Sequence, residues 1–363
     1  MRIWFWGVSV ILVFGNGLSI GFDSRLSTES ITGRVVASLG DSYAGMLRDL
    51  AELGTPEDPD TAPVGVVRGG FEQLAGPVDR LADALVAMQR LFTGSIASPL
   101  LTGLREAADG LRQHYVRIVG TVLHEVDACC ITEAPNTERH ASWQAMNAFA
   151  AELVRLQAIV FTLNYDSLLM SALLERGMAY DGFRFGTLNV PLDRWSEPAT
   201  LYHLHGSVAW HRSADGLVRK LRLEEVRDQG LLDAWASGSV ERGLPAVILG
   251  DLKTRYTEQY PFSVLYDELH RKLSQESLVV VGGYSFGDRP LNRALARFLS
   301  RDPRNRLVVW NPADTAGAYL SRLRRQLLEN ESPISDTQVT VEQVLLPDAD
   351  AVRRLGDAAG ASR

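Results

Sequence analysis

The first residues whose types and spacing could do chemistry form the run Gly15-Asn16-Gly17-Leu18-Ser19, which follows an apolar stretch. Glycines between a strand and a helix let a pyrophosphate approach the backbone amides at the start of the helix, where the helix dipole favours an anion. The spacing departs from the dehydrogenase fingerprint, because the third glycine comes one position late and no acidic residue ends a second strand about twenty residues on. A purely structural turn is the alternative. The run therefore predicts a nucleotide site that does not serve hydride transfer.

A second pair of polar residues, Asn164 and Asp166, follows another apolar stretch, with Tyr165 between them. In an extended chain alternate residues point the same way, so both side chains would face one space. Ligands of open α/β sheets bind at the carboxyl ends of the strands. The alternative is that Asp166 caps a helix starting at Ser167, which explains Asp166 but leaves Asn164 unexplained, because one cap suffices. We therefore predict a chemical role for Asn164.

His203 and His205 share one face of a further extended segment, and His211 follows nearby. Imidazoles are common metal ligands, but the cysteines are far away in sequence and no His-x-x-x-His pair or acidic triad accompanies these histidines. A buried structural histidine is the favoured interpretation of His203. His205 is the better candidate for a general base, because Gly206 after it would let a ligand approach closely.

A second glycine turn, Gly283-Tyr284-Ser285, ends another apolar stretch. Ser285 could donate a hydrogen bond to a phosphate or a ribose, and Asp288 is placed to cap a helix that begins near residue 290. The next apolar stretch ends at Asn311. Four strand ends thus carry polar or glycine-rich turns, and their convergence at one edge is what a nucleotide cleft requires.

Short apolar stretches rich in β-branched residues must position these groups, and they are typical of buried parallel strands. They comprise residues 8–14, 158–163, 246–249, 278–281 and 306–310, with a weaker candidate at 338–345. Helical patterns follow most of them, at 167–176, 290–299 and 313–328. Strands that alternate with helices predict an α/β fold with a doubly wound parallel sheet, covered on both faces.

The stretch 39–155 breaks this alternation. It shows no convincing strand, a loop rich in proline and glycine, and helical periodicity at 71–92, 111–126 and 143–156. We therefore predict a helical module inserted into the sheet domain. The expected division is 1–38 for the first strand and helix, 39–155 for the helical insertion, 156–346 for the rest of the sheet domain and 347–363 for a flexible tail.

Length, charge and cysteine content narrow the class of protein. A chain of 363 residues can bury a sizeable core, and its formal net charge of −7 argues against a nucleic-acid surface over the whole chain while leaving room for a local basic patch. The only cysteines are the adjacent Cys129 and Cys130, so neither a disulfide framework nor a zinc ribbon is expected. The apolar run at 3–14 is too short to span a membrane, and it leads into Gly15 where a signal peptide would have its cleavage site. We therefore expect a cytoplasmic protein.

The order of the motifs carries a resemblance. Gly-Asn-Gly-x-Ser, Leu-Asn-Tyr-Asp, Leu-His-Gly, Gly-Tyr-Ser and a strand that ends in Asn follow one another as in the sirtuin NAD-binding fold. The chain is more similar still to the zinc-less sirtuin-like NAD-hydrolase domains of bacterial antiphage defence systems. The resemblance covers residues 5–40 and 155–345, and it implies a Rossmann-like sheet of sirtuin type with NAD as the substrate and no metal.

The resemblance also implies roles for individual residues. The catalytic pair would be Asn164 and the general base His205. The residues that bind NAD would be Gly15, Asn16, Gly17 and Ser19 at the phosphates, Asp166 on the nicotinamide side, Gly283 and Ser285 at the ribose, and Asn311 on the adenosine side.

Several positions differ from those of deacylating sirtuins. Those enzymes have Ala where Asn16 stands, Gln where Leu163 stands and Thr where Tyr284 stands, and they carry a four-cysteine zinc module that this chain cannot build. The resemblance therefore implies an NAD hydrolase that releases nicotinamide and ADP-ribose. The alternatives are an NAD-dependent protein deacylase or ADP-ribosyltransferase, and a non-catalytic subunit that senses NAD.

Unregulated NAD hydrolysis would kill the host cell, so members of this family are held inactive until infection. The resemblance implies an effector that depletes NAD when activated, a homo-oligomer and a separately encoded activator, such as an Argonaute-type protein or a DNA-translocase-like ATPase. The sequence itself contains no ATPase P-loop and no clear module for direct binding of nucleic acid, and no direct membrane association is expected.

Overall fold

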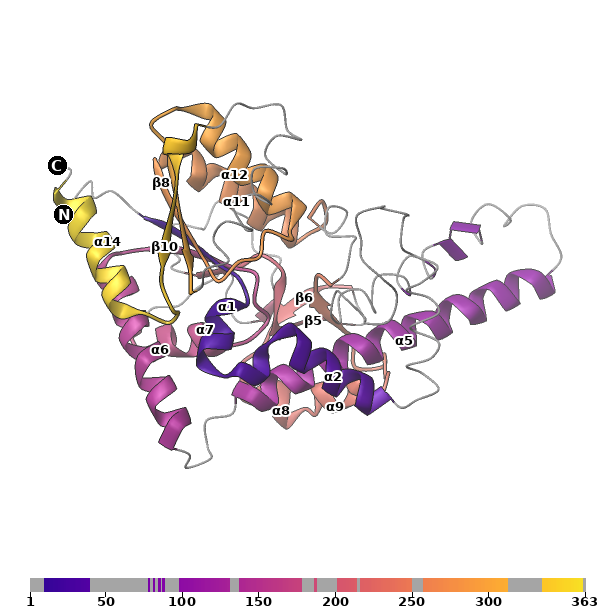
Figure 1. Cartoon of the computed structure of the whole chain (residues 1–363). Coiled ribbons are helices and arrows are strands. Elements are labelled where there is room, and N and C mark those ends of the chain that lie inside the picture. The colour runs from indigo at the N-terminus through magenta and orange to yellow at the C-terminus, as the bar shows by residue number, and fades with distance from the viewer. Residues whose placement is uncertain are drawn as a thin grey trace, which may run out of the picture.

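The computed structural model describes residues 10–39, 98–130, 137–177, 186–187, 201–213, 216–249, 257–312 and 335–361, with isolated helical residues between 78 and 88. Six strands form one sheet in the order β10-β9-β8-β1-β2-β4, and each pair of neighbours is parallel (Figure 1). The strands are β1 (Ile11–Phe14), β2 (Ile159–Thr162), β4 (Leu201–His203), β8 (Leu278–Gly282), β9 (Arg306–Asn311) and β10 (Val339–Gln343).

The strand order is that of a doubly wound fold. From β1 the chain moves outward to β2 and β4, then returns to the other side of β1 with β8 and continues to β9 and β10. The direction therefore reverses between β1 and β8, and ligands of such sheets bind outside the carboxyl ends of the strands at this switch point. The register places Phe14 beside both Thr162 and Gly282, so the turns after these three strands begin at the same level. The predicted fold class is confirmed.

Side chains of β1 alternate between two buried cores. Leu12 and Phe14 belong to one cluster, and Ile11 and Val13 belong to the other. The helices that contribute to the first cluster include α1 (Gly17–Phe22), α2 (Thr28–Leu39), α5 (Ser98–Cys130), α6 (Thr137–Arg155), α7 (Leu168–Leu174) and α14 (Ala349–Ala361). The helices of the second cluster are α11 (Phe262–Gln275) and α12 (Arg289–Arg301). Both faces of the sheet are thus covered, as the uniformly apolar strands require.

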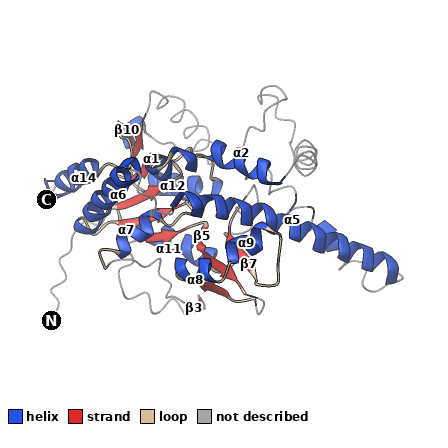
Figure 2. Ribbon diagram, turned by 90° about the horizontal axis from the view of Figure 1, so that it is seen from below, coloured by secondary structure: helices blue, strands red, loops and turns tan. Residues whose placement is uncertain are grey.

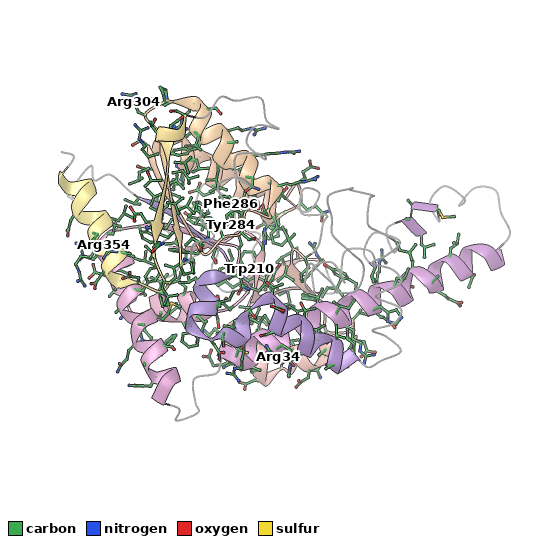
Figure 3. All side chains as sticks on the ribbon, in the orientation of Figure 1. Arg34, Trp210, Tyr284, Phe286, Arg304 and Arg354 are labelled. Atoms are coloured by element: carbon green, nitrogen blue, oxygen red, sulfur yellow. The ribbon has the colours of Figure 1, made fainter. Side chains whose placement is uncertain are left out.

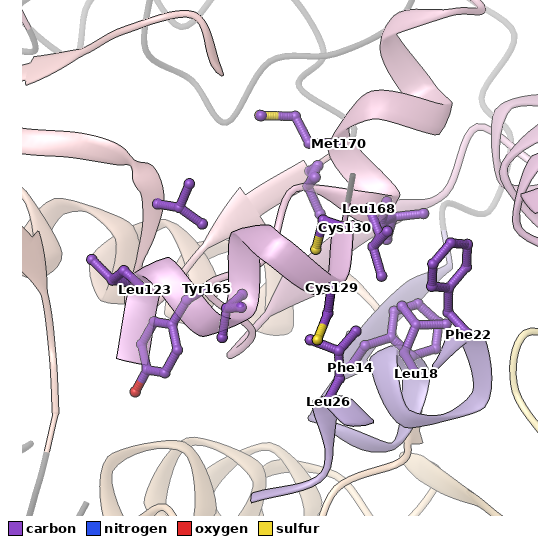
Figure 4. Close-up of a cluster of buried hydrophobic side chains, with 14 of the residues drawn as sticks. Phe14, Leu18, Phe22, Leu26, Leu123, Cys129, Cys130, Tyr165, Leu168 and Met170 are labelled. Atoms are coloured by element: carbon purple, nitrogen blue, oxygen red, sulfur yellow. The ribbon is translucent and has the colours of Figure 1, made fainter. Parts of the chain in front are cut away.

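Both cysteines lie at the end of α5, inside the first cluster. Figure 4 shows them beside Leu26 and Leu168, with Phe22 nearby. Both are buried and unpaired with each other, and burial raises the pKa of each thiol. Protonated buried thiols act as small apolar side chains, so this pair serves packing.

A second, antiparallel sheet lies beside the parallel one. Its strands run in the order β3-β6-β5-β7, and they are β3 (Gly186–Thr187), β5 (Gly206–Arg212), β6 (Val218–Lys220) and β7 (Leu244–Val247). The prediction that residues 246–249 belong to the parallel sheet is wrong, because β7 pairs antiparallel with β5. The short helices α8 (Leu223–Asp228) and α9 (Leu231–Ala236) follow β6, and α9 packs along α5.

The helical patterns at 111–126 and 143–156 are confirmed as parts of α5 and α6. Figure 2 shows α5 as a long rod, one end of which extends past the antiparallel sheet, whereas α6 packs against α7 and α14. The patterns at 71–92, apart from isolated residues, and at 313–328 lie outside the described residues. The division into a sheet domain and a helical insertion stays a prediction.

The segment 347–363, expected as a flexible tail, contains the helix α14. Ala351 and Val352 are buried in the first cluster, and the guanidinium of Arg353 contacts Glu152 on α6 at 3.1 Å. The apolar side chains on one face of this helix are enough to pack it against the first cluster. The polar composition of the whole segment gave no indication of this packing. Within the described residues, no helix combines the length and apolar character needed to cross a membrane.

Candidate active site

Three turns meet where β1, β8 and β9 end. The backbone amide of Gly15 donates to the carbonyl of Gly282 at 3.0 Å, and the amide of Gly17 donates to the carbonyl of Gly283 at 2.8 Å. The amide of Gly283 donates in turn to the carbonyl of Trp310 at 3.2 Å. The two glycine turns singled out in the sequence therefore form one hydrogen-bonded unit at the switch point of the sheet.

The glycines make this contact possible. A Cβ atom at Gly17 would lie 2.5 Å from Cα of Gly283, and one at Gly15 would lie 2.7 Å from the carbonyl oxygen of Gly283. Gly283 itself has φ +59°, a left-handed conformation that favours glycine. The structural-turn alternative is thus supported for these glycines, because their backbone amides form the hydrogen bonds that join the turns.

Ser19, Asn164 and Asp166 form a buried cluster between the turns after β1 and β2. The Ser19 hydroxyl donates a very short hydrogen bond to Oδ2 of Asp166, and Nδ2 of Asn164 donates to Oγ of Ser19 at 2.7 Å. The other carboxylate oxygen of Asp166 accepts from the amide of Leu168 at 3.1 Å, at the start of α7. The structure therefore brings together three of the predicted site residues from positions about 145 residues apart.

Asp166 bonds both to Ser19 in this buried cluster and to the start of α7. Burial raises the pKa of its carboxyl, although the hydrogen bonds from Ser19 and from the Leu168 amide oppose this shift. The helix-start alternative from the sequence is therefore supported, since one oxygen of Asp166 accepts from α7. The carboxamide Oδ1 of Asn164 accepts no hydrogen bond within the described part of the chain.

Asn16 points its side chain away from this cluster. Its Nδ2 donates to the carbonyl of Leu26 at 3.0 Å and to Oγ1 of Thr28 at 3.2 Å. These bonds connect the glycine turn to the beginning of α2. A contact of Asn16 with a nucleotide would therefore involve its backbone, and the side chain explains instead how the turn is held.

His205 lies in the turn between β4 and β5 and pairs with a carboxylate that the sequence analysis assigned only to capping. Its Nε2 is 2.9 Å from Oδ2 of Asp288, and both side chains are at most 2% exposed. The hydroxyl of Tyr266 lies 3.5 Å from the same ring nitrogen and donates to Oδ1 of Asp288 at 3.4 Å. Burial and the neighbouring Asp288 carboxylate raise the pKa of Tyr266 well above its usual value. Tyr266 lies on the apolar face of α11, and no local signal in the sequence marks it.

Gly206 has a different role from the one expected. Its φ is +83°, and a Cβ atom there would lie 2.2 Å from the carbonyl oxygen of Ala246. The glycine therefore allows β7 to approach β5, not a ligand to approach His205. His205 is nevertheless next to the Asn164 turn, because its ring centroid is 6.4 Å from that of Tyr165.

His203 and His205 have separate surroundings. Nδ1 of His203 lies 3.3 Å from the backbone carbonyl of Asn164, and its ring contacts Trp210 edge-on. His203 is 1% exposed, which confirms a buried structural histidine. Among the residues that the structure describes, no three histidine, cysteine or acidic side chains gather in a way that could hold a metal ion.

The turn after β8 is held by Tyr284, the residue that stands where deacylating sirtuins have Thr. Its hydroxyl donates to Oδ1 of Asn292 at 2.8 Å and accepts from the amide of Asp288 at 3.0 Å. Phe286, which Figure 3 labels beside Tyr284 in the middle of the molecule, has the left-handed φ of +58° although it is bulky and fully buried. Such backbone strain persists only where the surroundings enforce it, and it clusters at functional sites.

The remaining predicted residues lie on the same edge. Ser285 is exposed in the turn after β8, and Asn311 is the last residue of β9, where it pairs with Gln343 of β10. Asn311 is buried, and its backbone carbonyl accepts from the amide of Val344 at 3.2 Å. Every residue proposed from the sequence thus follows or ends one of the strands β1, β2, β4, β8 and β9.

Two acceptor atoms are left over in this arrangement. The carboxamide Oδ1 of Asn164 and the ring nitrogen Nδ1 of His205 take part in no hydrogen bond within the described residues, and both side chains are buried. Two acceptors on neighbouring turns of one sheet edge can receive hydrogen bonds from a ligand. The ligand must supply donors, which hydroxyl groups and water do.

Part of the chain is similar in sequence to a known protein family, and the chain is similar in structure to solved proteins. Residues 158–332 match the family model of the SIR2-like domain. No protein of curated function matches the chain in sequence. A Sir2 homologue in complex with NAD is similar in structure, with 14% identity, a TM-score of 0.40 and coverage of 98% of this chain and 90% of that one. A complex of Sir2 with a p53 peptide and NAD+ gives 14% identity, a TM-score of 0.40 and coverage of 97% and 94%.

The matched range begins just before β2 and extends beyond β9, so it contains Asn164, His205, Asp288 and Asn311. The turn after β1 precedes it, but β1 is the central strand of the same sheet and its turn is bonded to the turn after β8. The sirtuin-like assignment made from the order of the motifs is confirmed for residues 158–332, which match the SIR2-like domain.

Proposed function

We propose that this chain is an NAD hydrolase, which cleaves the bond between nicotinamide and ribose and releases nicotinamide and ADP-ribose. The observation that carries the proposal is a pair of acceptors that carry no hydrogen bond from the described residues, Asn164 Oδ1 and the second ring nitrogen of His205, on neighbouring turns of one sheet edge. The ribose of NAD carries hydroxyl donors, and hydrolysis needs an ordered water. The SIR2-like domain over residues 158–332 supports NAD as the substrate.

In this proposal the glycine turns bind the two ends of the substrate. Gly15, Asn16 and Gly17 would lie against the phosphates, with the amides of Gly15 and Gly17 holding the turn in place, and Ser19 would hold Asn164 through its hydroxyl. The remaining contacts would come from Asp166 on the nicotinamide side, Gly283 and Ser285 at the ribose and Asn311 on the adenosine side. No metal ion takes part.

Cleavage would proceed by attack of water on C1′ of the ribose. As the bond from C1′ to the nicotinamide nitrogen breaks, nicotinamide keeps the bonding electron pair and leaves as a neutral base. Positive charge on the ribose is relieved as the water oxygen bonds to C1′, and His205 takes the proton from that water directly or from a ribose hydroxyl that the water then reprotonates. Asn164 would orient the acceptor or the water through Oδ1.

The direct test follows NAD consumption and nicotinamide release by chromatography, with the purified chain alone and with proteins encoded beside it. We expect His205→Ala to lower the rate about 10²–10⁴-fold, the usual contribution of a positioned general base. Asn164→Ala should lower the rate more than it weakens NAD binding. The matched control is His140→Ala, because that histidine is exposed on α6. Normal turnover by folded His205→Ala would contradict the assignment.

Product analysis separates hydrolysis from group transfer. In the presence of an acylated peptide, free ADP-ribose as the sole product supports hydrolysis, and O-acyl-ADP-ribose supports deacylation. We further propose that the chain is the effector of an antiphage defence system, acting in the cytoplasm as a homo-oligomer under a separately encoded activator. The sirtuin-like resemblance supports this role. Loss of cellular NAD after phage challenge in cells with the intact chain, but not with His205→Ala, is the expected result.

A further inference from the structure

The proposed reaction leaves one buried charged group without a role, the carboxylate of Asp288. It stands at the start of α12, and the histidine that it contacts lies 83 positions earlier in the turn after β4. The two side chains are 1% and 2% exposed, so neither is a surface ion pair. Placing a carboxylate in such surroundings is costly unless its oxygens accept hydrogen bonds.

The two oxygens of Asp288 have different partners. Oδ1 accepts from the backbone amide of Leu291 at 2.8 Å and so caps α12, and it also accepts from the hydroxyl of Tyr266. Oδ2 lies 2.9 Å from Nε2 of His205. Capping needs only the first oxygen, and serine or asparagine would provide it equally well. The second oxygen therefore accounts for an aspartate at this position.

We propose that Asp288 is a positioning residue, which accepts a hydrogen bond from Nε2–H of His205 and thereby keeps the lone pair of the imidazole on Nδ1, the nitrogen that meets the substrate. A neutral imidazole carries one donor and one acceptor nitrogen, and an ionised carboxylate can only accept. The hydrogen on Nε2 is thus fixed by the partner, and the base end of the ring is fixed with it. This inference rests on the proposed function for the identity of the substrate but not for the tautomer.

The backbone of Asp288 is also held by hydrogen bonds. The hydroxyl of Tyr284 bonds to both the amide and the carbonyl of Asp288, each at 3.0 Å, and it also reaches Asn292 on α12. The groups that face His205 are the Asp288 carboxylate, the Tyr266 hydroxyl from α11 and the ring of Tyr165. Among these only the Asp288 side chain is a carboxyl group, and burial raises the pKa of the Tyr266 hydroxyl well above its usual value.

The variant Asp288→Asn separates the two roles. Asparagine caps a helix as well as aspartate does, and capping requires its Oδ1 to face the Leu291 amide. Its Nδ2 must then face Nε2 of His205. Because Nδ2 is a donor, Nε2 must become the acceptor, and the ring hydrogen moves to Nδ1. Nδ1 then has no lone pair with which to accept a proton. We expect kcat to fall about 10²–10⁴-fold with KM and the melting temperature little changed.

The matched control is Asp302→Asn at the other end of α12, whose carboxylate is paired with Arg304 and contacts no site residue. We expect its kcat to equal that of the unaltered chain. An unchanged kcat in Asp288→Asn would show a capping role alone, whatever the melting temperature, and would overturn the proposal.

A second measurement needs neither a variant nor activity. Nitrogen-15 NMR of the imidazole reports which nitrogen carries the hydrogen, and we expect neutral His205 to be protonated at Nε2 in the unaltered chain and at Nδ1 in Asp288→Asn. A hydrogen on Nδ1 of the unaltered chain at neutral pH would overturn the proposal. If the chain does not cleave NAD, the function fails while this measurement still decides the role of Asp288. If NAD is cleaved normally by Asp288→Asn, the function stands and the positioning role fails.

Discussion

The contact between the two glycine turns predicts an unusual response to alanine. Gly17 is the first residue of α1 and Gly33 lies inside α2, so both substitutions add one methyl group to a helix. At Gly33 nothing lies within 4 Å of the new Cβ atom, whereas at Gly17 it would lie 2.5 Å from Cα of Gly283. The same chemical change therefore meets open space in one place and a neighbouring backbone in the other.

The expected magnitudes have opposite signs. Alanine in an open helix position stabilises by roughly 0.5–1 kcal/mol relative to glycine, so Gly33→Ala should raise the free energy of unfolding by that amount. At Gly17 carbon atoms need about 3.5–4 Å, so the turns must separate by about 1 Å. This stretches the 2.8 Å hydrogen bond from Gly17 to Gly283, which contributes about 0.5–1.5 kcal/mol. Overpacking adds to this loss, and Gly17→Ala should destabilise by about 1–3 kcal/mol.

Urea unfolding of the two variants and the unaltered chain, followed by circular dichroism, measures both effects under one condition. The expected order of unfolding midpoints is Gly33→Ala, then the unaltered chain, then Gly17→Ala. A midpoint for Gly17→Ala at or above that of the unaltered chain would refute the packing of the two turns. A lowered midpoint for Gly33→Ala would refute the premise that the added methyl group meets open space.

Two further predictions concern charged groups outside the site. Burial raises the pKa of Glu276 to about 7, although Lys272 opposes the shift, so the folded chain binds this proton more tightly and the associated stability is lost as pH rises from about 4.5 to 7. Glu276→Gln should therefore stabilise by about 1–2 kcal/mol at pH 8, discounted for partial exposure, and little at pH 4.5, in urea unfolding at both pH values. Asp127 accepts two hydrogen bonds from Arg227, at 2.8 and 2.9 Å, which join α5 to α8. Asp127→Ala should lower the unfolding free energy by about 1–3 kcal/mol in the same assay, and an unchanged value would contradict this role.

The sequence was sufficient for features that depend on local patterns. The apolar stretches predicted the parallel strands because a strand covered on both faces is apolar throughout. The same sequence pattern was misleading at 246–249, where an equally apolar stretch belongs to β7 of the antiparallel sheet. The difference arises from the partner strand, and pairing with β5 depends on the close approach at Gly206, which no periodicity reveals.

The composition of the site was more predictable than its contacts. Alternation of strands and helices places the ends of β1, β2, β4, β8 and β9 at one edge, so the candidate residues had to lie there. The cap formed by Asp288 was also predictable, because capping is local. Its contact with His205 was not, since it joins positions 83 residues apart through side-chain conformations that the sequence does not encode locally.

The observed hydrogen bonds limit which groups at the glycine-rich turns can bind a substrate. Most of the polar side chains of the edge are already engaged: Ser19 and Asp166 bond to each other, and Asn16 bonds to the start of α2. Within the described residues two acceptors carry no hydrogen bond, Oδ1 of Asn164 and Nδ1 of His205, and in each case the other polar atom is beside a neighbour: Nδ2 of Asn164 donates to Ser19, and Nε2 of His205 lies 2.9 Å from Asp288. A rigid pair of acceptors favours a substrate with donors in fixed positions, as a ribose has. In the proposed reaction the glycine turn would determine where such a substrate lies, and Ser19 and Asp288 would determine how Asn164 and His205 face it.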